Sequence, residues 1–309
     1  MKIIKTTYRS LNWILGFAIE PMISTIFCKA KHSKTPIFII GPPRSGTTLT
    51  FQLVTNCLNL GYLNNLHGLL YGLPALVSLL THKKTRQENF SSNLGLTRGW
   101  LGPSECGQWW YRFFPRNPVY VTRDMIDQRK LLAFKRSLVS IASAEGRPLI
   151  FKNLFAGMRL DAILSAFPDA LFLYVSRDLR NNAHSILEGR LNATGSFQNW
   201  WSVPPPGYEK LLDLSPEIQV VEQIRMIHGQ LEMDIERLSL GSRVMRVKYE
   251  DLCMDPCMFV DQLEVFLSMA NIQIERLAPP PTNFTISTKS ALPAEISEKL
   301  NLAIKRVSD

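Results

Sequence analysis

The stretch that decides the fold is PIFII at residues 36–40, followed directly by GPPRSGTT at residues 41–48. The first five residues form a continuous apolar run, which is typical of a strand buried on both faces of a parallel sheet. The loop that follows is rich in glycine and proline, and residues 49–60 beyond it have helical character. The sequence therefore predicts a strand, a tight loop and a helix in direct succession.

The loop has the composition of an anion-binding site. Where a loop leaves a buried strand and opens a helix, successive backbone N–H groups can curl around an anionic oxygen at the positive end of the helix. Gly41 and Gly46 permit the tight path, and Thr47 and Thr48 add hydroxyl donors. The spacing is that of a P-loop, but Thr47 stands where a nucleotidase P-loop has its lysine, and Arg44 supplies the cation instead. A plain tight turn is the alternative.

Beyond the loop, short apolar runs alternate with helical segments. Further strands are expected at residues 148–151, 170–176 and 243–247, and further helices at residues 129–144, 161–167, 181–191, 218–238 and 256–269. Strands that alternate with helices predict βαβ units and a parallel sheet. We therefore expect a three-layer α/β fold, similar to that of P-loop NTPases, in which helices flank a central parallel sheet.

Three parts of the chain do not fit this alternation. Residues 61–128 contain glycine, proline and an aromatic cluster, and we expect them to be irregular and lid-like. The tail beyond residue 281 is expected to wrap back loosely, and residues 1–35 to form a helical extension. Residues 36–309 are expected to form a single domain.

The composition is that of a packed globular protein with an anionic partner. The 309 residues are 46% hydrophobic and 20% charged, which excludes a disordered or fibrous chain. Lysine and arginine number 35 against 26 acidic residues, so the formal net charge is +9, which favours anionic ligands or an acidic membrane surface. The densest basic runs, at residues 83–86 and 129–130, are short, so we do not expect a nucleic-acid partner.

The cysteines indicate a reducing compartment. The chain has five, an odd number without the spacing of a disulfide framework. They are Cys28, Cys57, Cys106, Cys253 and Cys257. The last two have no matching histidine or cysteine pair for a zinc site, so we expect them to pack and expect no metal. This interpretation predicts a cytoplasmic location.

The N-terminal segment allows three interpretations. Residues 11–19 are apolar, but Glu20 and Pro21 interrupt the run before it is long enough to span a bilayer. The first interpretation is a helix packed against the domain. The second is a helix that lies on a membrane surface, because basic residues precede the apolar run. These are Lys2, Lys5 and Arg9. The third is a type II membrane anchor, as in Golgi proteins.

RSGTT at residues 44–48 resembles the 5′-phosphosulfate-binding loop of the sulfotransferase superfamily, in the form found in bacterial and tyrosylprotein sulfotransferases. The sulfuryl donor of that superfamily is 3′-phosphoadenosine 5′-phosphosulfate. The resemblance covers roughly residues 36–270. It implies that the donor binds to five loop residues: Arg44, Ser45, Gly46, Thr47 and Thr48.

The family's second phosphate motif is a strand that ends in arginine, followed by a helix with a serine. Here residues 171–176 run into Arg177, and Ser185 lies eight residues further on. The resemblance implies that Arg177 and Ser185 bind the 3′-phosphate, since an arginine at the carboxyl end of a strand can fork onto a phosphate. Pairing of Arg177 with Asp169 or Asp178 is the alternative.

Two further segments match the order of the family's motifs. IFKN at residues 150–153 resembles the strand with a central lysine, and VKYEDL at residues 247–252 resembles a late Tyr-Glu-Asp-Leu element, whose acidic residues we interpret as structural. The resemblance implies that Arg44 neutralises charge on the leaving phosphate and that Lys152 assists on the sulfonate side. A lysine satisfied at the strand end is the alternative for Lys152.

The general base is the gap in the resemblance. Asn65 and Leu154 occupy the positions at which family members carry a glutamate or a histidine. The remaining candidates are Glu105 and His67. Glu105 lies in a glycine- and proline-rich turn beside aromatic residues, where desolvation would raise the pKa of its carboxyl, and a solvated carboxylate or helix cap is the alternative. His184, inside the second motif's helix, is interpreted as structural.

Trp109-Trp110 and Trp200-Trp201 suggest an aromatic acceptor cleft, with a core beneath a loop as the alternative. The resemblance implies sulfuryl transfer to a hydroxyl of a carbohydrate or lipid, without a metal. A nucleotide-dependent kinase is one rival, although it requires a lysine after Gly46. A non-catalytic nucleotide- or membrane-binding protein is the other. The expected partners are a nucleotide donor, a small-molecule, glycan or lipid acceptor, and a membrane surface at the N-terminal helix.

Overall fold

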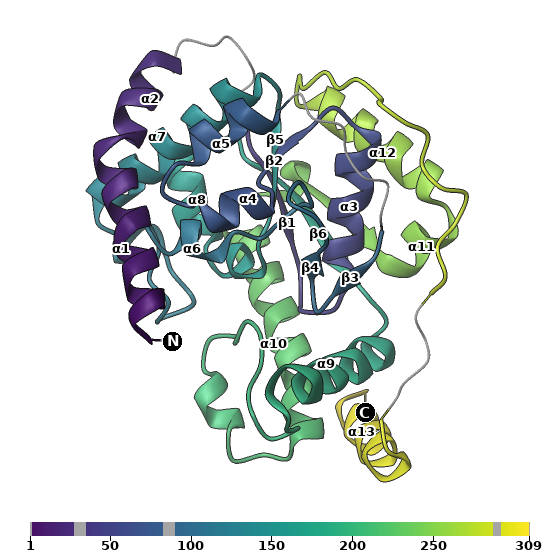
Figure 1. Cartoon of the computed structure of the whole chain (residues 1–309). Coiled ribbons are helices and arrows are strands. Elements are labelled where there is room, and N and C mark those ends of the chain that lie inside the picture. Colours follow the sequence, from purple (N-terminus) through teal and green to yellow (C-terminus); the bar gives the residue numbers. More distant parts are fainter. Residues whose placement is uncertain (1, 28–34, 83–89, 287–291, 309) are drawn as a thin grey trace.

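A five-stranded parallel sheet forms the centre of the computed structural model, which describes residues 2–27, 35–82, 90–286 and 292–308 (Figure 1). Its strands are β1 (Ile37–Ile40), β2 (Gly61–Tyr62), β5 (Leu149–Lys152), β6 (Leu171–Ser176) and β7 (Val244–Lys248). They lie in the order β2-β5-β1-β6-β7, and every neighbouring pair is parallel. The predicted α/β fold with a central parallel sheet is confirmed.

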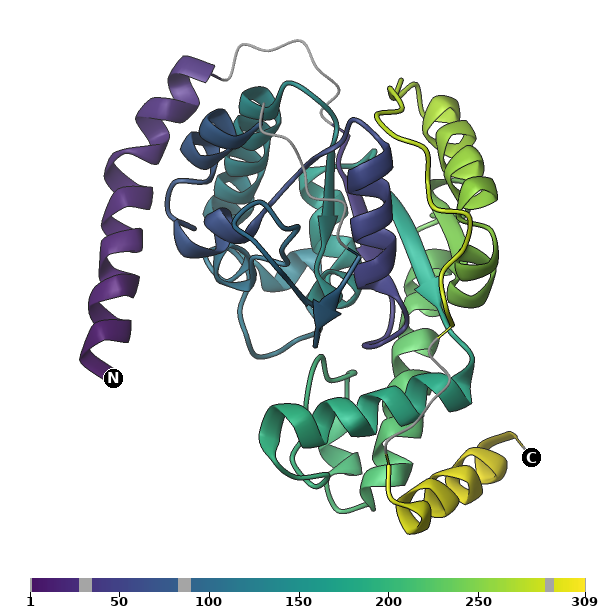
Figure 2. The same cartoon turned by 45° about the vertical axis from the view of Figure 1, so that its right-hand side comes forward.

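Alternation along β1 explains why helices cover both faces of the sheet. Phe38 and Ile40 point into one core, and Ile37 and Ile39 point into the other, so neither face of this strand meets water. The first core is closed by α6 (Gly107–Trp110), α7 (Gln128–Glu145), α8 (Leu160–Ala166) and α10 (Pro216–Arg237). The second is closed by α3 (Thr47–Cys57), α11 (Tyr249–Met254) and α12 (Pro256–Met269) (Figure 2).

The region expected to be an irregular lid contains regular structure. It holds α4 (Asn65–Leu69), α5 (Pro74–Thr81) and an antiparallel hairpin of β3 (Ser92–Asn93) and β4 (Leu96–Thr97). Within this region a short 3-10 turn occurs at Arg123–Met125, and others lie further along the chain at Leu154–Met158, Tyr208–Leu211 and Gly241–Arg243. The expectation was wrong for most of the aromatic cluster, because Trp109, Trp110, Phe113 and Phe114 belong to the core of the sheet.

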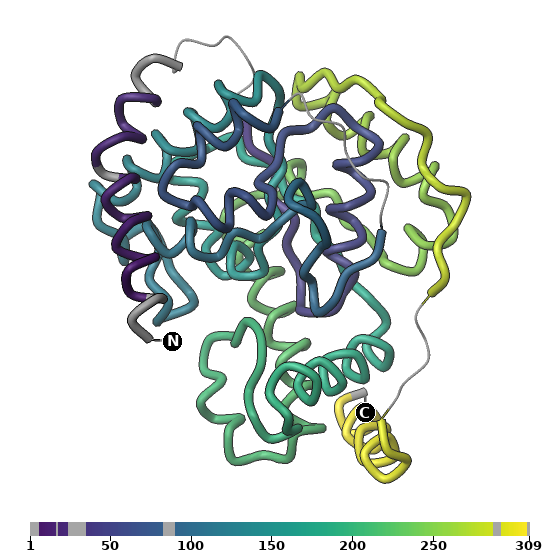
Figure 3. The backbone as a smooth tube through the Cα atoms, viewed as in Figure 1, coloured from purple at the N-terminus to yellow at the C-terminus, as the bar shows by residue number. Residues whose placement is uncertain are grey.

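The tail is also more ordered than expected. Helix α13 (Ala294–Ser308) packs its apolar residues against α9 (Leu179–Thr194) and α10. The buried residues of this third core on α13 are Leu300, Ala303 and Ile304. The tube in Figure 3 shows the C-terminal helix lying beneath α9, far from the N-terminal helices.

Helices α1 (Lys2–Ala18) and α2 (Glu20–Phe27) pack along one side of the protein, where α2 contacts α5 and α7. Asn12 accepts a 2.9 Å hydrogen bond from the backbone N–H of Gly72, and Glu20 accepts one of 3.0 Å from Ala75. Among the described residues, no helix is both long and apolar enough to cross a membrane. Cys28 and the basic run at residues 83–86 lie outside the described residues, as do the side chains of Lys2 and Lys5.

Candidate functional site

Two glycines shape the loop between β1 and α3. Gly41 has φ of 148°, and a Cβ atom there would lie 2.3 Å from the carbonyl oxygen of Val175 on β6. Gly46 has φ of 98°, and a Cβ atom there would lie 2.3 Å from the ring of Tyr249. Both positions combine left-handed backbone with a close approach that no larger residue permits. The loop is therefore pressed tightly onto the carboxyl edge of the sheet.

Hydrogen bonds join this loop to the second phosphate motif. Arg44 Nε donates to Ser185 Oγ on α9 at 2.9 Å, and Arg177 Nη1 donates to the carbonyl oxygen of Arg44 at 3.1 Å. Asn182, also on α9, donates to the carbonyl oxygen of Pro43 at 2.7 Å. The two motifs are far apart in sequence, and the carboxyl ends of neighbouring parallel strands bring them together.

The paired arginines make this edge strongly electropositive. Burial lowers the pKa of Arg44, and the positive charge of Arg177 lowers it further. The guanidinium of Arg177 also stacks on Tyr249, with its carbon 4.6 Å from the ring centroid. Arginine nevertheless keeps its charge in proteins. Two partly desolvated cations held side by side favour an anionic ligand.

A second polar cluster lies next to the loop. Lys152, at the end of β5, donates to Thr48 Oγ1 at 3.1 Å and forms an ion pair with Glu105. The Lys152 side chain is only 3% exposed and that of Glu105 is 32% exposed. Asn153 donates to the Glu105 carbonyl oxygen at 3.3 Å. Glu105 is thus held at the sheet edge rather than solvated in a free loop.

These groups surround one small cavity of about 160 Å³. Its lining includes predicted donor-site residues from every motif: Arg44, Gly46, Thr47, Thr48, Lys152, Arg177 and Ser185. A neighbouring hollow of about 240 Å³ is lined by Glu105, and Gly95 of the β3–β4 hairpin borders both spaces. Ser45 does not line the cavity, because its hydroxyl turns inward and donates to the carbonyl oxygen of Pro42 at 2.8 Å.

The protein-family model described as "Sulfotransferase family" matches residues 36–272. The chain belongs to the sulfotransferase family. Among solved structures, it is similar to sulfotransferase STF9 from Mycobacterium avium, with a TM-score of 0.51 and 17% identity over 89% of this chain and 68% of that chain. Sulfotransferase STF1 from Mycobacterium tuberculosis H37Rv gives a TM-score of 0.45 and 17% identity over 83% and 75%. Comparison with curated proteins gives no match.

His67 of this sulfotransferase is buried away from the cavity, whereas a general base should face it. Its Nδ1 accepts from the backbone N–H of Asn64 at 3.1 Å, its Nε2 lies 3.0 Å from Ser78 Oγ, and its side chain is fully buried. Burial lowers the pKa of His67 to about 3. The imidazole caps α4 and lies outside the lining of the cavity, so it is not placed to accept a proton from a substrate there.

The two tryptophan pairs, Trp109-Trp110 and Trp200-Trp201, lie in different environments. Trp109 and Trp110 are buried in the core beside Phe134, so the expectation that they line an acceptor cleft was wrong. Trp201, in contrast, lines the cavity of the sulfotransferase, whereas Trp200 packs against Tyr208. An adjacent pair in a loop gives no sequence signal of which ring turns inward.

Sequence reasoning missed several residues of the cavity. Tyr249 follows β7 directly, and its place at the carboxyl end of a strand was a signal that it belongs to the site. Ser92 and Gly95 reach the cavity from the hairpin, which no motif predicted. Within the described residues, no group of three or more His, Cys, Asp or Glu side chains is arranged to hold a metal ion.

Proposed function

We propose that this sulfotransferase moves a sulfuryl group from 3′-phosphoadenosine 5′-phosphosulfate to a hydroxyl of a carbohydrate or lipid. The observation that carries the proposal is the direct bonding of the two phosphate motifs, through Arg44 Nε to Ser185 Oγ and Arg177 Nη1 to the Arg44 carbonyl. The donor has a 5′-phosphosulfate and a 3′-phosphate on the same ribose, so it needs two anion-binding sites at a fixed separation. The pairing of these motifs around one cavity meets that need.

The residues divide into two donor-binding groups. The loop N–H groups, with Thr47 and Thr48, are suited to the 5′-phosphosulfate, because they open helix α3 at its positive end. Arg177 and Ser185 are suited to the 3′-phosphate. Gly46 lets the loop backbone pack directly against the Tyr249 ring, because a Cβ atom there would lie 2.3 Å from it. The donor supplies the sulfuryl group and a phosphate leaving group.

Lys152 and Glu105 are the proposed catalytic pair. Glu105 is the proposed base, accepting the proton that the acceptor hydroxyl loses, and Lys152 offsets negative charge beside the sulfonate. Their ion pair holds both side chains at the border of the cavity and the neighbouring hollow. Arg44 stabilises the charge that develops on the leaving phosphate. The hollow lined by Glu105 is the proposed entry for the acceptor.

The decisive experiment is transfer of labelled sulfate from the donor to an array of glycans and lipids. We expect label in the acceptor with the wild-type chain and none with Arg44→Ala. Parallel reactions with labelled ATP and Mg²⁺ test the kinase alternative. Phosphate transfer without sulfate transfer would overturn the proposal, and donor binding without any transfer would identify a non-catalytic binding protein.

A further inference from the structure

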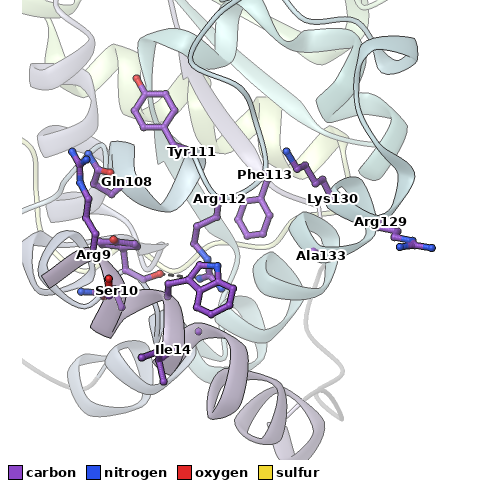
Figure 4. A pocket seen from close by; sticks show the side chains of 14 residues that line it. Arg9, Ser10, Ile14, Gln108, Tyr111, Arg112, Phe113, Arg129, Lys130 and Ala133 are labelled. Carbon is purple, nitrogen blue, oxygen red and sulfur yellow. Dashed lines mark hydrogen bonds between the residues drawn. The ribbon is translucent and has the colours of Figure 1, made fainter. Parts of the chain in front are cut away.

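A basic crevice separates α1 from α6 and α7, away from the proposed donor site (Figure 4). Its volume is about 930 Å³. One wall carries Arg9 and Trp13 of α1, and the other carries Arg112 with Arg129 and Lys130 at the start of α7. No acidic residue is found among the described side chains that line it.

The outer face of the N-terminal helices beside this crevice is apolar. Leu11 and Ile14 are 52% and 54% exposed, and they lie one turn apart on the face of α1 opposite to Asn12. Trp13 is 70% exposed on the side of α1 that borders the crevice, and Met22 on α2 is 66% exposed. Single exposed apolar residues are common on proteins. Four exposed apolar side chains along one pair of helices, with cations at their edge, are typical of a surface that binds a membrane or another molecule.

We propose that this surface docks onto an anionic lipid bilayer. It comprises Leu11, Ile14 and Met22 on the outer side of the N-terminal helices, with Trp13, Arg9, Arg129 and Lys130 along the edge of the crevice. Apolar and indole side chains insert at the boundary between lipid head groups and acyl chains, and the adjacent cations bind the acidic head groups. This proposal concerns a surface apart from the proposed catalytic groups and does not rest on the proposed function.

Charge favours a bilayer over a second copy of the chain as the occupant. In a symmetric dimer the same surface meets itself, so Arg9, Arg129 and Lys130 of both copies would gather in one interface, and the described crevice lining offers them no acidic partner. Like charges placed against each other oppose association. The formal net charge of +9 adds repulsion between copies and attraction to an acidic membrane.

Vesicle co-sedimentation of the full chain tests the proposal. We expect binding to phosphatidylcholine vesicles that contain phosphatidylglycerol, much weaker binding to pure phosphatidylcholine, and loss of binding as salt is raised. The double variant Arg129→Glu/Lys130→Glu should bind at least about thirtyfold more weakly. Glutamate in the first turn of α7 suits the helix dipole, so this variant should fold.

Matched variants elsewhere make the result specific. Lys305→Glu/Arg306→Glu on α13 changes the charge equally, at a site far from α1 in both views (Figures 1 and 2), and should retain most of the binding. Trp13→Ser/Ile14→Ser should lose binding, whereas Leu302→Ser/Met269→Ser should not. Equal binding to both vesicle types, equal losses in test and control variants, or a solution dimer dissolved by Trp13→Ser/Ile14→Ser would each overturn the proposal.

Discussion

Arg44 Nε and Ser185 Oγ lie 2.9 Å apart although 141 positions separate them in the chain. This bond ties the loop after β1 to helix α9, which follows β6. Neighbouring parallel strands place both segments at the same edge of the sheet. The fold therefore positions the two phosphate motifs relative to each other.

Arg177→Ala should reduce the affinity for adenosine 3′,5′-bisphosphate by about 10- to 100-fold, because it removes a charged hydrogen-bond donor from the proposed 3′-phosphate site. Thermal-shift titration measures this loss. Arg180→Ala, which is exposed in the first turn of α9, is the matched control and should leave the titration unchanged. Full stabilisation of the Arg177 variant would remove that residue from the donor site.

Glu105→Gln should lower kcat by about 100-fold or more while donor affinity stays close to that of the wild type, because the amide cannot accept a proton. Its carbonyl oxygen keeps the hydrogen bond from Lys152, so the variant preserves the local geometry. Steady-state kinetics with a saturating donor separates the two effects. Wild-type turnover would show that another group is the base.

His67→Ala should destabilise the protein by about 2–4 kcal/mol without lowering kcat of the folded enzyme, because the imidazole fills a fully buried site and caps α4. Urea unfolding measures the first effect, and kinetics below the transition measures the second. A large fall in kcat with unchanged stability would return His67 to the list of catalytic candidates.

Gly46→Ala should weaken donor binding and destabilise the protein by about 1–3 kcal/mol. Its Cβ atom would lie 2.3 Å from the Tyr249 ring, at a position with positive φ. Gly195→Ala isolates the backbone cost, because Gly195 has φ of 75° but no atom within 4 Å of its Cβ position. If both variants behave alike, the contact with Tyr249 is unimportant.

The attachment of the N-terminal helices should depend on pH through Glu20. Burial raises the pKa of this carboxyl to about 7. The folded state therefore holds a proton that the unfolded state releases near pH 4.5, so the contribution to stability is fully present below that pH and is lost as pH rises through 7. The loss amounts to about 2–3 kcal/mol.

Glu20→Gln should remove this part of the pH dependence. Unfolding in urea at pH 5 and pH 8, together with hydrogen exchange of α1, measures it. Glu298→Gln, exposed on α13, is the control and should retain the wild-type profile. A wild-type profile in the Glu20 variant would assign the titration to another group.

Local patterns predicted four of the five strands of the central sheet, the loop after β1 and the second phosphate motif, because each is encoded within about fifteen consecutive residues. The short strand β2 lies in the region expected to be irregular and was missed. The apolar run of β1 needs burial on both faces, and Arg177 follows its strand directly. What the sequence left open depends on contacts between distant segments. Glu105 lies beside Lys152 only because the fold brings the two segments together, and the burial of His67 likewise depends on tertiary packing that no local pattern encodes.

The tight packing of aromatic side chains was equally inaccessible from sequence. Trp109 and Trp201 each belong to an adjacent pair near a turn, yet the first completes the core and the second lines the cavity. The hairpin that brings Gly95 to the cavity is short, and its strands carry no apolar alternation. Such features depend on how the helices and loops pack against the sheet, which the hydrophobic periodicity of the sequence does not encode.

Helix α13 gives the donor site a distant support. Its residues Leu300, Ala303 and Ile304 pack against Ala183, Ile186 and Leu187, which flank Ser185 on α9. The segment that matches the family model ends at residue 272, so α13 lies outside the matched segment. Substitutions in α13 should therefore lower the affinity of the proposed donor site for the nucleotide before they destabilise the central sheet.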